Sequence, residues 1–375
     1  MTVERRKHKL DKTLLGLTIL LVTLGVLLIA TISFPLAFEK FNDGYYFLRH
    51  QIIYGLLPGI LLGFVAFKIP LNFLREKSLI FFLINLIILS FVFLPKIGAT
   101  FEGATRWIKL GNITFQPSEF LKITVILYLA SLVSKNSFAK VTKKKIENFY
   151  PQLFSFLIIL AIISLVLFFQ PHISTLGIIL ASLLVIYFSG KTPIFHTILI
   201  TLFLLAGLFF LLTSAPYRLQ RLSVFLEPET DSLGIGYQSK QSLITIGSGK
   251  ILGQGIGMSR QKFGFLPQPA SDSIFAIFAE ETGFLGSVIL ILLFLIFLWR
   301  GIKISKESSE LFLQLVSLGI TFWIVLQAFL NIGGLLGIIP LSGTPLSFIS
   351  YGGSHLIAEL IGVGLLLNIS RYRTL

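Results

Sequence analysis

Apolar runs of similar length recur along the whole chain. Each approaches the roughly 20 residues that a helix needs to cross a bilayer. Of the 375 residues, 54% are hydrophobic, above the roughly 45–50% that is usual in soluble domains. The sequence therefore predicts an all-α, polytopic membrane protein, with residues 1–375 forming a single transmembrane domain and no separate soluble domain.

Hydropathy and the positions of proline, glycine and charged residues predict ten transmembrane helices. They are expected at 14–35, 49–67, 79–95, 117–133, 152–169, 173–189, 194–213, 273–299, 311–335 and 346–369. The first follows a basic segment, but it is too long for a signal peptide and lacks a small-residue cleavage site, so we expect it to be retained. The chain has no cysteine, which excludes disulfides, thiol nucleophiles and thiolate metal sites.

The basic residues are distributed asymmetrically. A net charge of +14 would indicate nucleic acid binding in a soluble protein, but here most lysines and arginines fall in alternate loops, on the side that carries both termini. Cytoplasmic loops of membrane proteins have this excess. We therefore expect a bacterial cytoplasmic membrane protein with both termini inside and no nucleic acid partner.

One connection is much longer than the others. Residues 214–272 separate the seventh and eighth predicted helices and fall outside the membrane, and long connections of this kind are usually functional. The segment carries an expected amphipathic helix near 237–246 and a series of glycines. Its basic residues, which predict an anionic partner at the outer surface, are Arg218, Arg221, Lys240, Lys250, Arg260 and Lys262.

Asp272 ends this loop, just after Pro267 and Pro269. An aspartate there either caps the eighth helix, stabilising it by about 1 kcal/mol, or serves as a functional carboxylate. At 100° per residue, Glu280 lies about 80° around the helix from Asp272 and Glu281 is nearly opposite. These glutamates are therefore not expected to pair with Asp272, and should face the bundle interior with other partners.

A second charged group begins the fourth predicted helix, in the segment "GATRWIKLGNITFQPSEFLK". Glu119 and Lys122 are three residues apart, so they share a helix face and can form an ion pair. The pair is either structural or lines a substrate cavity, and the sequence leaves both open. Arg106 precedes it in a predicted outer loop, where it either binds phosphate or anchors the membrane interface.

The approach to the last helix is irregular. In "PLSGTPLSFISYGGSHLIAELIG", prolines and glycines interrupt the helical pattern, and such backbone is tolerated at membrane depth only where it is buried or lines a cavity. His355 and Glu359 lie four residues apart, which favours a buried hydrogen bond over a ligand pair or proton relay. His172, in a short turn at the outer mouth, is assigned no role.

Three segments, taken in order, resemble the SEDS family of FtsW, RodA and SpoVE proteins. They are the two quoted above, together with "YQSKQSLITIGSGKILGQGIGMSRQKFGFLPQPASDSIFAIFAEETGFLG". The resemblance extends from the first helix to the last, and the N-terminal part is more similar to the division protein FtsW than to the elongation protein RodA. It implies ten transmembrane helices and a peptidoglycan glycosyltransferase that polymerises lipid II outside the membrane.

The resemblance also implies site residues and partners. The essential loop aspartate of the family falls on Asp272, which we assign as general base. The expected partners are a class B penicillin-binding protein and other division proteins of the membrane, and the expected cofactor is a divalent cation, Mg²⁺ or Mn²⁺, with ligands that the sequence does not specify. The predicted substrate-binding residues are Glu119, Lys122, Arg106, Arg218, Gln241, Lys262, Ser350, Gly352 and Gly353.

The chain departs from the family pattern at several positions. His172 stands where the family usually has an aspartate, so an acidic residue is missing from the outer mouth. Ser347 replaces a proline, and His355 replaces a serine. Two other functions are left open by the residues themselves: a lipid II flippase, because polar residues inside a bundle also mark transport paths, and a scaffold that recruits a transpeptidase. A polymerase of the elongation type is the alternative within the family.

Overall fold

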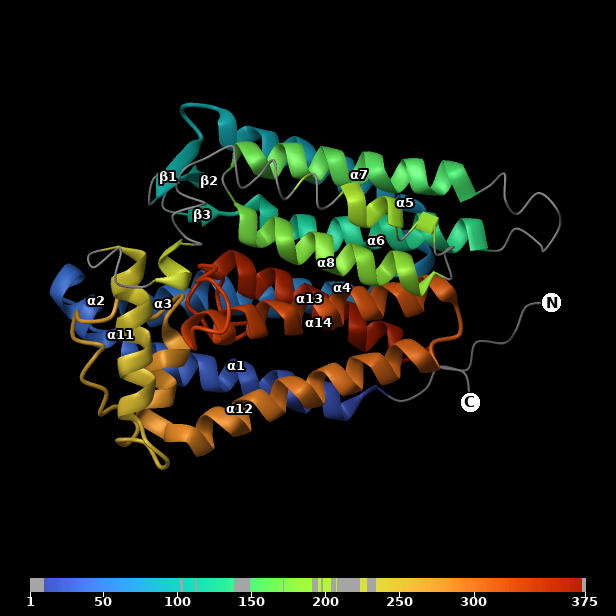
Figure 1. Cartoon of the computed structure of the whole chain (residues 1–375). Coiled ribbons are helices and arrows are strands. Elements are labelled where there is room, and N and C mark those ends of the chain that lie inside the picture. The colour runs from blue at the N-terminus through green and yellow to red at the C-terminus, as the bar shows by residue number, and fades with distance from the viewer. Residues whose placement is uncertain are drawn as a thin grey trace.

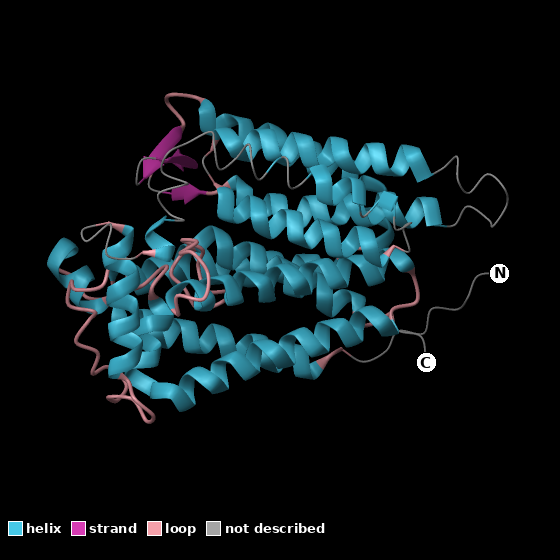
Figure 2. Cartoon of the chain, viewed as in Figure 1, coloured by secondary structure: helices cyan, strands magenta, loops and turns pink. Residues whose placement is uncertain are grey.

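A computed structural model of the chain describes residues 10–101, 104–111, 113–137, 149–170, 172–190, 195–196, 198–203, 207, 223–227 and 234–372. Within these ranges the protein is a helical bundle with one small sheet at one end (Figures 1 and 2). Six helical stretches are long and apolar enough to span a membrane, and three shorter apolar helices accompany them. The predicted helical membrane fold is confirmed, although most of the predicted span 194–213 lies outside the described residues.

The first three predicted spans are present with different ends. Helix α1 (Lys12–Ile32) stops before Ser33, and a short helix α2 (Phe34–Phe41) follows with proline in its first turn. The second span consists of α3 (Tyr46–Gln51), a π-helical turn η1 (Ile52–Leu56) and α4 (Leu57–Lys68). The third, α5 (Leu71–Ser90), begins earlier than expected because Pro70 starts the helix, so Arg75 and Lys77 are helical.

The π-helical turn has a local cause. Pro58 lacks an N–H group and its ring crowds the carbonyl four residues earlier, which disturbs the α-helical hydrogen bonds there. A Cβ atom added at Gly353 would lie 2.8 Å from the carbonyl oxygen of Tyr54. The backbones of the second and last spans therefore meet at this turn, and only glycine permits the contact.

The predicted outer loop between the third and fourth spans contains a small antiparallel sheet. Strands β1 (Gly98–Phe101), β2 (Ala104–Leu110) and β3 (Ile113–Phe115) pair in that order, with an irregularity in β1. The sequence analysis expected only a loop here and did not predict the strands. The segment is rich in β-branched and aromatic residues, and Gly111, with a φ of +62°, follows β2 directly.

The remaining helices follow the predicted order. They are α6 (Pro117–Ser137), α7 (Phe149–Phe169), α8 (Ile173–Ser189), α11 (Ile235–Ser248), α12 (Ile274–Glu307), α13 (Leu311–Leu335) and α14 (Gly353–Ile369). The amphipathic helix expected near 237–246 is α11, which lies across the end of the bundle in Figure 1. Residues 346–352 are non-helical, so the span predicted at 346–369 begins later than expected, at Gly353. The prolines and glycines of this segment had indicated an irregular approach to the helix.

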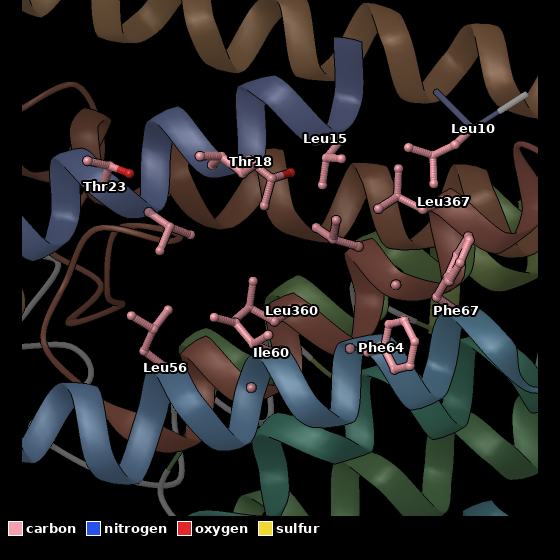
Figure 3. A pocket seen from close by; sticks show the side chains of 16 residues that line it. Leu10, Leu15, Thr18, Thr23, Leu56, Ile60, Phe64, Phe67, Leu360 and Leu367 are labelled. Carbon is pink, nitrogen blue, oxygen red and sulfur yellow. The ribbon is translucent and has the colours of Figure 1, made fainter. Parts of the chain in front are cut away.

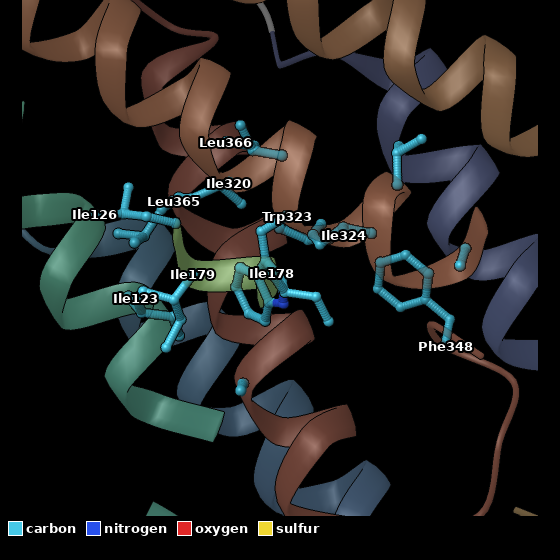
Figure 4. Packing of buried hydrophobic residues seen from close by; sticks show 14 of the residues in the cluster. Ile123, Ile126, Ile178, Ile179, Ile320, Trp323, Ile324, Phe348, Leu365 and Leu366 are labelled. Atoms are coloured by element: carbon cyan, nitrogen blue, oxygen red, sulfur yellow. The ribbon is translucent and has the colours of Figure 1, made fainter. Parts of the chain in front are cut away.

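The core lies where α6, α8, α13 and α14 meet. Figure 4 shows Trp323 of α13 among isoleucines and leucines from these helices, and its side chain is fully buried. Most of α6 and α13 is buried, whereas α1, α5 and α12 expose long apolar faces. An apolar exterior is what lipid favours, so polar groups are expected to gather in the centre and at the ends of the bundle.

The two ends of the bundle differ. At one end the beginning and the end of the chain lie together, since the Asp11 backbone N–H donates to Ser370 Oγ at 3.3 Å and Arg300 forms an ion pair with Asp11 at 2.8 Å. The opposite end carries the sheet, α2, α3 and α11 (Figure 1). We call this the loop end of the bundle, and it holds the Asp272 turn.

Candidate active site

The turn that carries Asp272 is fixed by three different elements. The Asp272 carbonyl oxygen accepts a 2.7 Å hydrogen bond from Asn331 Nδ2 on α13. Ser350 Oγ donates to the Ser271 carbonyl at 2.6 Å from the irregular segment before α14. Gln238 Nε2 on α11 donates to Ser273 Oγ at 3.2 Å. The backbone position of this aspartate is therefore determined from α11, α13 and the 346–352 segment together.

Asp272 is not the cap residue of α12. The helix begins at Ile274 with Ser273 as its N-cap residue, and the Ser273 side chain makes no capping hydrogen bond. Ser273 Oγ donates instead to the Pro267 carbonyl at 2.8 Å, which closes the turn. Of the two roles that the sequence allowed, the cap position falls on the neighbouring Ser273, and a chemical role of the Asp272 carboxylate stays a prediction.

A small cavity opens beside the Asp272 carboxylate. Its lining comes from α11, α13 and the connection before α14, and consists of Gln238, Asp272, Asn331, Leu335, Leu341, Ser342 and Gly343. Asp272 is partly buried. A Cβ atom at Gly343 would lie 3.4 Å from Asp272 Oδ2, and the φ of Gly343 is +62°. Glycine thus provides both the turn and the space beside the carboxylate.

The far wall of this cavity is tied to α8 and α13. Ser174 Oγ donates to the Ser342 carbonyl, Ser342 Oγ and Thr344 Oγ1 are 2.7 Å apart, and Asn331 Nδ2 also donates to the Thr344 carbonyl at 2.7 Å. A single amide, that of Asn331, therefore joins the Asp272 turn to the opposite wall. The sequence analysis did not identify this asparagine, and its signal was a polar residue in an apolar run.

His172 has a structural position that the sequence analysis missed. Its Nδ1 lies 3.4 Å from Ser118 Oγ and its Nε2 lies 3.1 Å from Thr175 Oγ1. Burial, and then the positive charges of Arg106 and Lys122, hold the pKa of the imidazole well below 6.5, so the ring is neutral at pH 7. It joins the starts of α6 and α8 at a position where the family aspartate would instead add negative charge.

Glu119 and Lys122 form a fully buried pair. Lys122 Nζ lies 2.8 Å from Glu119 Oε2, donates to Gln327 Oε1 at 2.7 Å, and lies 4.8 Å from the centroid of the Trp323 ring. Neither residue lines the cavity at Asp272. Of the two interpretations left open, the structure therefore favours the structural ion pair, and the predicted contact with substrate stays a prediction.

The pair belongs to a longer network. Gln327 Nε2 donates to Glu359 Oε1 and to the Pro345 carbonyl, each at 3.2 Å, and Glu359 Oε2 accepts from the Phe348 N–H at 2.7 Å. The predicted hydrogen bond between His355 and Glu359 is absent from the described residues, since the two carboxylate oxygens have these other partners. The network links α6 and α13 to the irregular segment 346–352, from which Ser350 donates a hydrogen bond to the Asp272 turn.

Glu280 and Glu281 bind the loop that follows α11. Glu280 accepts hydrogen bonds from the Ser259 hydroxyl and the Arg260 N–H, and Glu281 Oε1 lies 3.6 Å from Lys262 Nζ. Both glutamates are buried. The prediction that their partners would be residues other than Asp272 is confirmed, but these partners belong to the loop and not to the interior of the bundle. The two glutamates hold residues 249–262 against α12.

The other predicted substrate-binding residues are spread over the loop end. Gln241 donates to Gln261 within the loop, and buried Lys262 donates to the Gly257 carbonyl at 2.6 Å. Arg106 on β2 donates to the Gln170 carbonyl at 3.3 Å. Gly352 donates its N–H to Gln51 Oε1 at 2.9 Å. Arg218 lies outside the described residues.

These predicted residues differ in how they relate to the Asp272 turn. Among the members of the set that the structure describes, Ser350 alone has a hydrogen bond to the Asp272 turn. Gly352 and Gly353 contact the second span instead. The hydrogen bonds of Gln241 and Lys262 stay within the loop. Any direct contact of these residues with a substrate therefore stays a prediction.

Comparison with known proteins identifies the family. The family model of FtsW, RodA and SpoVE, described as "Cell cycle protein", matches residues 11–375. The chain belongs to this family. Among its FtsW/RodA/SpoVE relatives, stage V sporulation protein E of Bacillus subtilis strain 168 is 36% identical, with 98% of each chain covered. A probable peptidoglycan glycosyltransferase FtsW of Geobacter sp. strain M18 is 34% identical, again with 98% of each covered.

Solved structures of the FtsW/RodA/SpoVE family share the fold. A chain from a study of how a peptidoglycan synthase complex coordinates polymerization and crosslinking superposes with a TM-score of 0.75 at 26% identity, covering 97% of this chain and 98% of that one. The rod shape determining protein RodA of Thermus thermophilus gives a TM-score of 0.69 at 25% identity, with 97% and 98% covered. This chain therefore shares its overall fold with these solved relatives.

Proposed function

We propose that this chain is a peptidoglycan glycosyltransferase that polymerises lipid II at the outer face of the cytoplasmic membrane. The observation that carries the proposal is the Asp272 carboxylate, held beside a small polar cavity at the loop end of the bundle by α11, α13 and the segment before α14. Membership of a family with relatives of that name supports the reaction class.

In the proposed mechanism, Asp272 acts as the general base. Its carboxylate accepts the proton of a saccharide 4-hydroxyl as the oxygen attacks the anomeric carbon of a second lipid-linked saccharide. The bond from that carbon to the pyrophosphate breaks, and undecaprenyl pyrophosphate leaves. The three anchors of the Asp272 turn keep the carboxylate in place, so that little reorganisation is needed when the hydroxyl arrives.

Positive charge at the loop end of the bundle would attract the anionic substrate. Lys250 and Arg260 are exposed on the loop after α11, and Arg106 lies partly buried on β2. Cations on one surface raise the local concentration of an anionic ligand, and those that reach a leaving group stabilise the charge that develops on it. This arrangement supports a pyrophosphate-linked substrate at the loop end.

The cavity residues fit a divalent cation of the Mg²⁺ type. Within the described residues there is no group of three acidic, histidine or cysteine side chains. However, Mg²⁺ is commonly bound by one or two carboxylates together with substrate phosphates and water. Asn331 Oδ1 is buried with no hydrogen-bond partner in the described part of the chain. Asp272 and Asn331 would hold the ion, which when bound would neutralise charge on the leaving pyrophosphate.

The proposal includes a transpeptidase partner of the class B penicillin-binding type. It is supported by the solved relative from a study of a peptidoglycan synthase complex. It is also supported by large apolar side chains exposed on the loop after α11, including Leu252, Ile256 and Met258, since an apolar patch at a surface commonly marks a protein contact.

The proposal extends to a role at the division septum. It rests on the sequence relatives, which are a sporulation protein E and FtsW proteins at 34–36% identity, against 25% for the solved RodA. A fluorescent fusion that gathers along the side wall and not at the division plane would instead favour the elongation role.

The direct test is polymerisation by purified protein. Wild type, with a transpeptidase partner, lipid II and Mg²⁺, is expected to give glycan polymer on a gel, and Asp272→Asn should reduce the rate by about 10²–10⁴-fold, the usual contribution of a general base. Glu39→Gln is the matched control, because Glu39 is an exposed carboxylate on α2. Full activity of Asp272→Asn at equal protein level would refute the assignment, and no polymer from either protein would favour transport or scaffolding.

A further inference from the structure

An apolar groove runs between α1, α4 and α14, away from Asp272. It has a volume of about 560 Å³, and its lining includes Leu15, Ile19, Ile60, Phe64, Leu360 and Leu367. Figure 3 shows side chains of α1 and of α4 facing one another across it, with α14 behind. It extends from Leu56 and Thr23 near mid-bundle to Leu10 and Phe67 at the end where the chain begins and ends.

The groove is open to the surrounding membrane. Ile19, Ile60 and Phe64 are 57%, 56% and 58% exposed, so the walls are accessible from outside the bundle. The floor results from close helix packing, since a Cβ atom at Gly364 would lie 2.1 Å from the Gly63 carbonyl oxygen. Helices α4 and α14 touch there, whereas α1 lies further away. An open channel lined by apolar side chains is therefore left between α1 and the α4–α14 pair.

Two cations stand at one mouth of the groove. Lys68 Nζ lies 5.3 Å from the centroid of the Phe64 ring and 5.6 Å from that of Phe67, and the Arg371 guanidinium lies 5.1 Å from the Phe67 ring. The same two phenylalanines line the groove. Lys68 is exposed, and within the described residues neither cation forms an ion pair. An apolar channel thus ends at unpaired positive charge.

The size of the groove limits what can occupy it. A 20-residue helix about 30 Å long and about 10 Å across occupies about 2,400 Å³, several times the available 560 Å³. The volume lies within the roughly 300–1,000 Å³ of small-molecule sites. An inserted transmembrane helix is therefore too large, whereas a single hydrocarbon chain has a suitable size.

We propose that this groove binds an anionic phospholipid, with one acyl chain between α1, α4 and α14 and the phosphate on Lys68 and Arg371. Basic pockets between transmembrane helices are suited to such headgroups. With both termini in the cytoplasm, as proposed above, this mouth lies in the cytoplasmic leaflet. The choice of leaflet therefore depends on the proposed orientation. The binding itself does not depend on orientation or on the glycosyltransferase reaction, so the two proposals fail separately.

The test measures which lipids the protein retains. The full chain is reconstituted in nanodiscs of equal parts phosphatidylglycerol and phosphatidylcholine, released into mild detergent, and analysed by native mass spectrometry. Wild type should retain one phosphatidylglycerol in preference to phosphatidylcholine. Lys68→Gln and Arg371→Gln should each reduce that retention about fivefold, the effect expected of one basic residue at an anionic lipid surface.

Matched control variants test whether lipid retention depends on this groove in particular, and not on any loss of positive charge or any added bulk. Lys77→Gln with Lys306→Gln removes two exposed cations away from the groove, and retention should not change. Ile19→Trp and Ile60→Trp narrow the groove and should abolish retention, whereas Leu20→Trp and Leu61→Trp alter exposed neighbours that do not line it. The Lys68 and Arg371 variants keep the test valid if a tryptophan variant fails to fold.

Two outcomes would overturn the proposal. In the first, phosphatidylglycerol and phosphatidylcholine are retained equally, or retention survives the loss of both cations. In the second, the tryptophan variants leave lipid retention intact but convert a dimer mass to a monomer mass, which would assign the groove to a second copy of the chain. Asp272→Asn should retain lipid as wild type does, since Asp272 does not line this groove.

Discussion

Lys122 and Glu119 place opposite charges inside the bundle, with side chains only 2% and 4% exposed and 2.8 Å apart. Removing one member leaves the other charge buried without compensation, which usually costs about 3–5 kcal/mol. We expect Lys122→Met to lower the free energy of unfolding in mixed micelles by this amount. The double variant Lys122→Met with Glu119→Leu should recover at least half of the loss, because no unpaired charge is left. An equal loss in single and double variants would mean that packing, and not charge, dominates at this position.

At the scale of elements, α12 is broken at Gly283, where φ is +70° and ψ is −165°. The break lets the Phe284 N–H donate to the Lys250 carbonyl, while the Gln254 N–H donates to the Glu280 carbonyl, each at 2.9 Å. A Cβ atom at Gly283 would lie 2.3 Å from the Gly253 nitrogen, a clash that a side chain cannot avoid. The loop after α11 is therefore docked on the helix that starts at the Asp272 turn.

Gly283→Ala should undock this loop. We expect amide hydrogen exchange at Gln254 and Gly255 to accelerate at least tenfold, since strain at such a φ costs about 1–3 kcal/mol and the clash adds to it. Gly247→Ala in α11 is the control, because a Cβ atom there meets nothing within 4 Å, and exchange should stay at the wild-type rate. Unchanged exchange in Gly283→Ala would show that the loop is held by Glu280 and Glu281 alone.

At the scale of the whole molecule, the orientation in the membrane follows from charge and can be measured directly. The chain has no cysteine, so single-cysteine variants give an unambiguous signal. Lys40→Cys and Lys250→Cys, exposed at the loop end, should react with an impermeant maleimide in intact cells. Lys77→Cys and Lys306→Cys, exposed at the other end, should react only after permeabilisation. The reverse pattern would place both termini outside and contradict the proposed site of polymerisation.

Much of the architecture was readable from local patterns. The bounds of α8 and α13 agree with the predicted spans, because their ends coincide with the limits of continuous apolar runs. The start of α5 was misplaced, since Arg75, Glu76 and Lys77 were taken for a loop although Pro70 starts the helix before them. The sheet at 98–115 was missed, although its alternating residues and Gly111 carried a recognisable signal.

The candidate site was readable only in part. Asp272 was identified from its place at the end of a long loop, but its neighbours Gln238, Asn331 and Ser342 come from segments far apart in sequence. Gln327 likewise was a single polar residue in an apolar run, and its role in joining Lys122 to Glu359 depends on three helices packing together. Contacts of this kind have no local signature.

By itself, the sequence determined that this chain is a helical membrane protein and that a carboxylate ends its long loop, because lipid imposes length and apolarity on each segment separately. Only the tertiary structure decided that Glu119 and Lys122 lie in the core, that Glu280 and Glu281 hold a loop, and that α1, α4 and α14 leave a groove. These features depend on the distances between helices, and helix packing fixes those distances for all the segments at once.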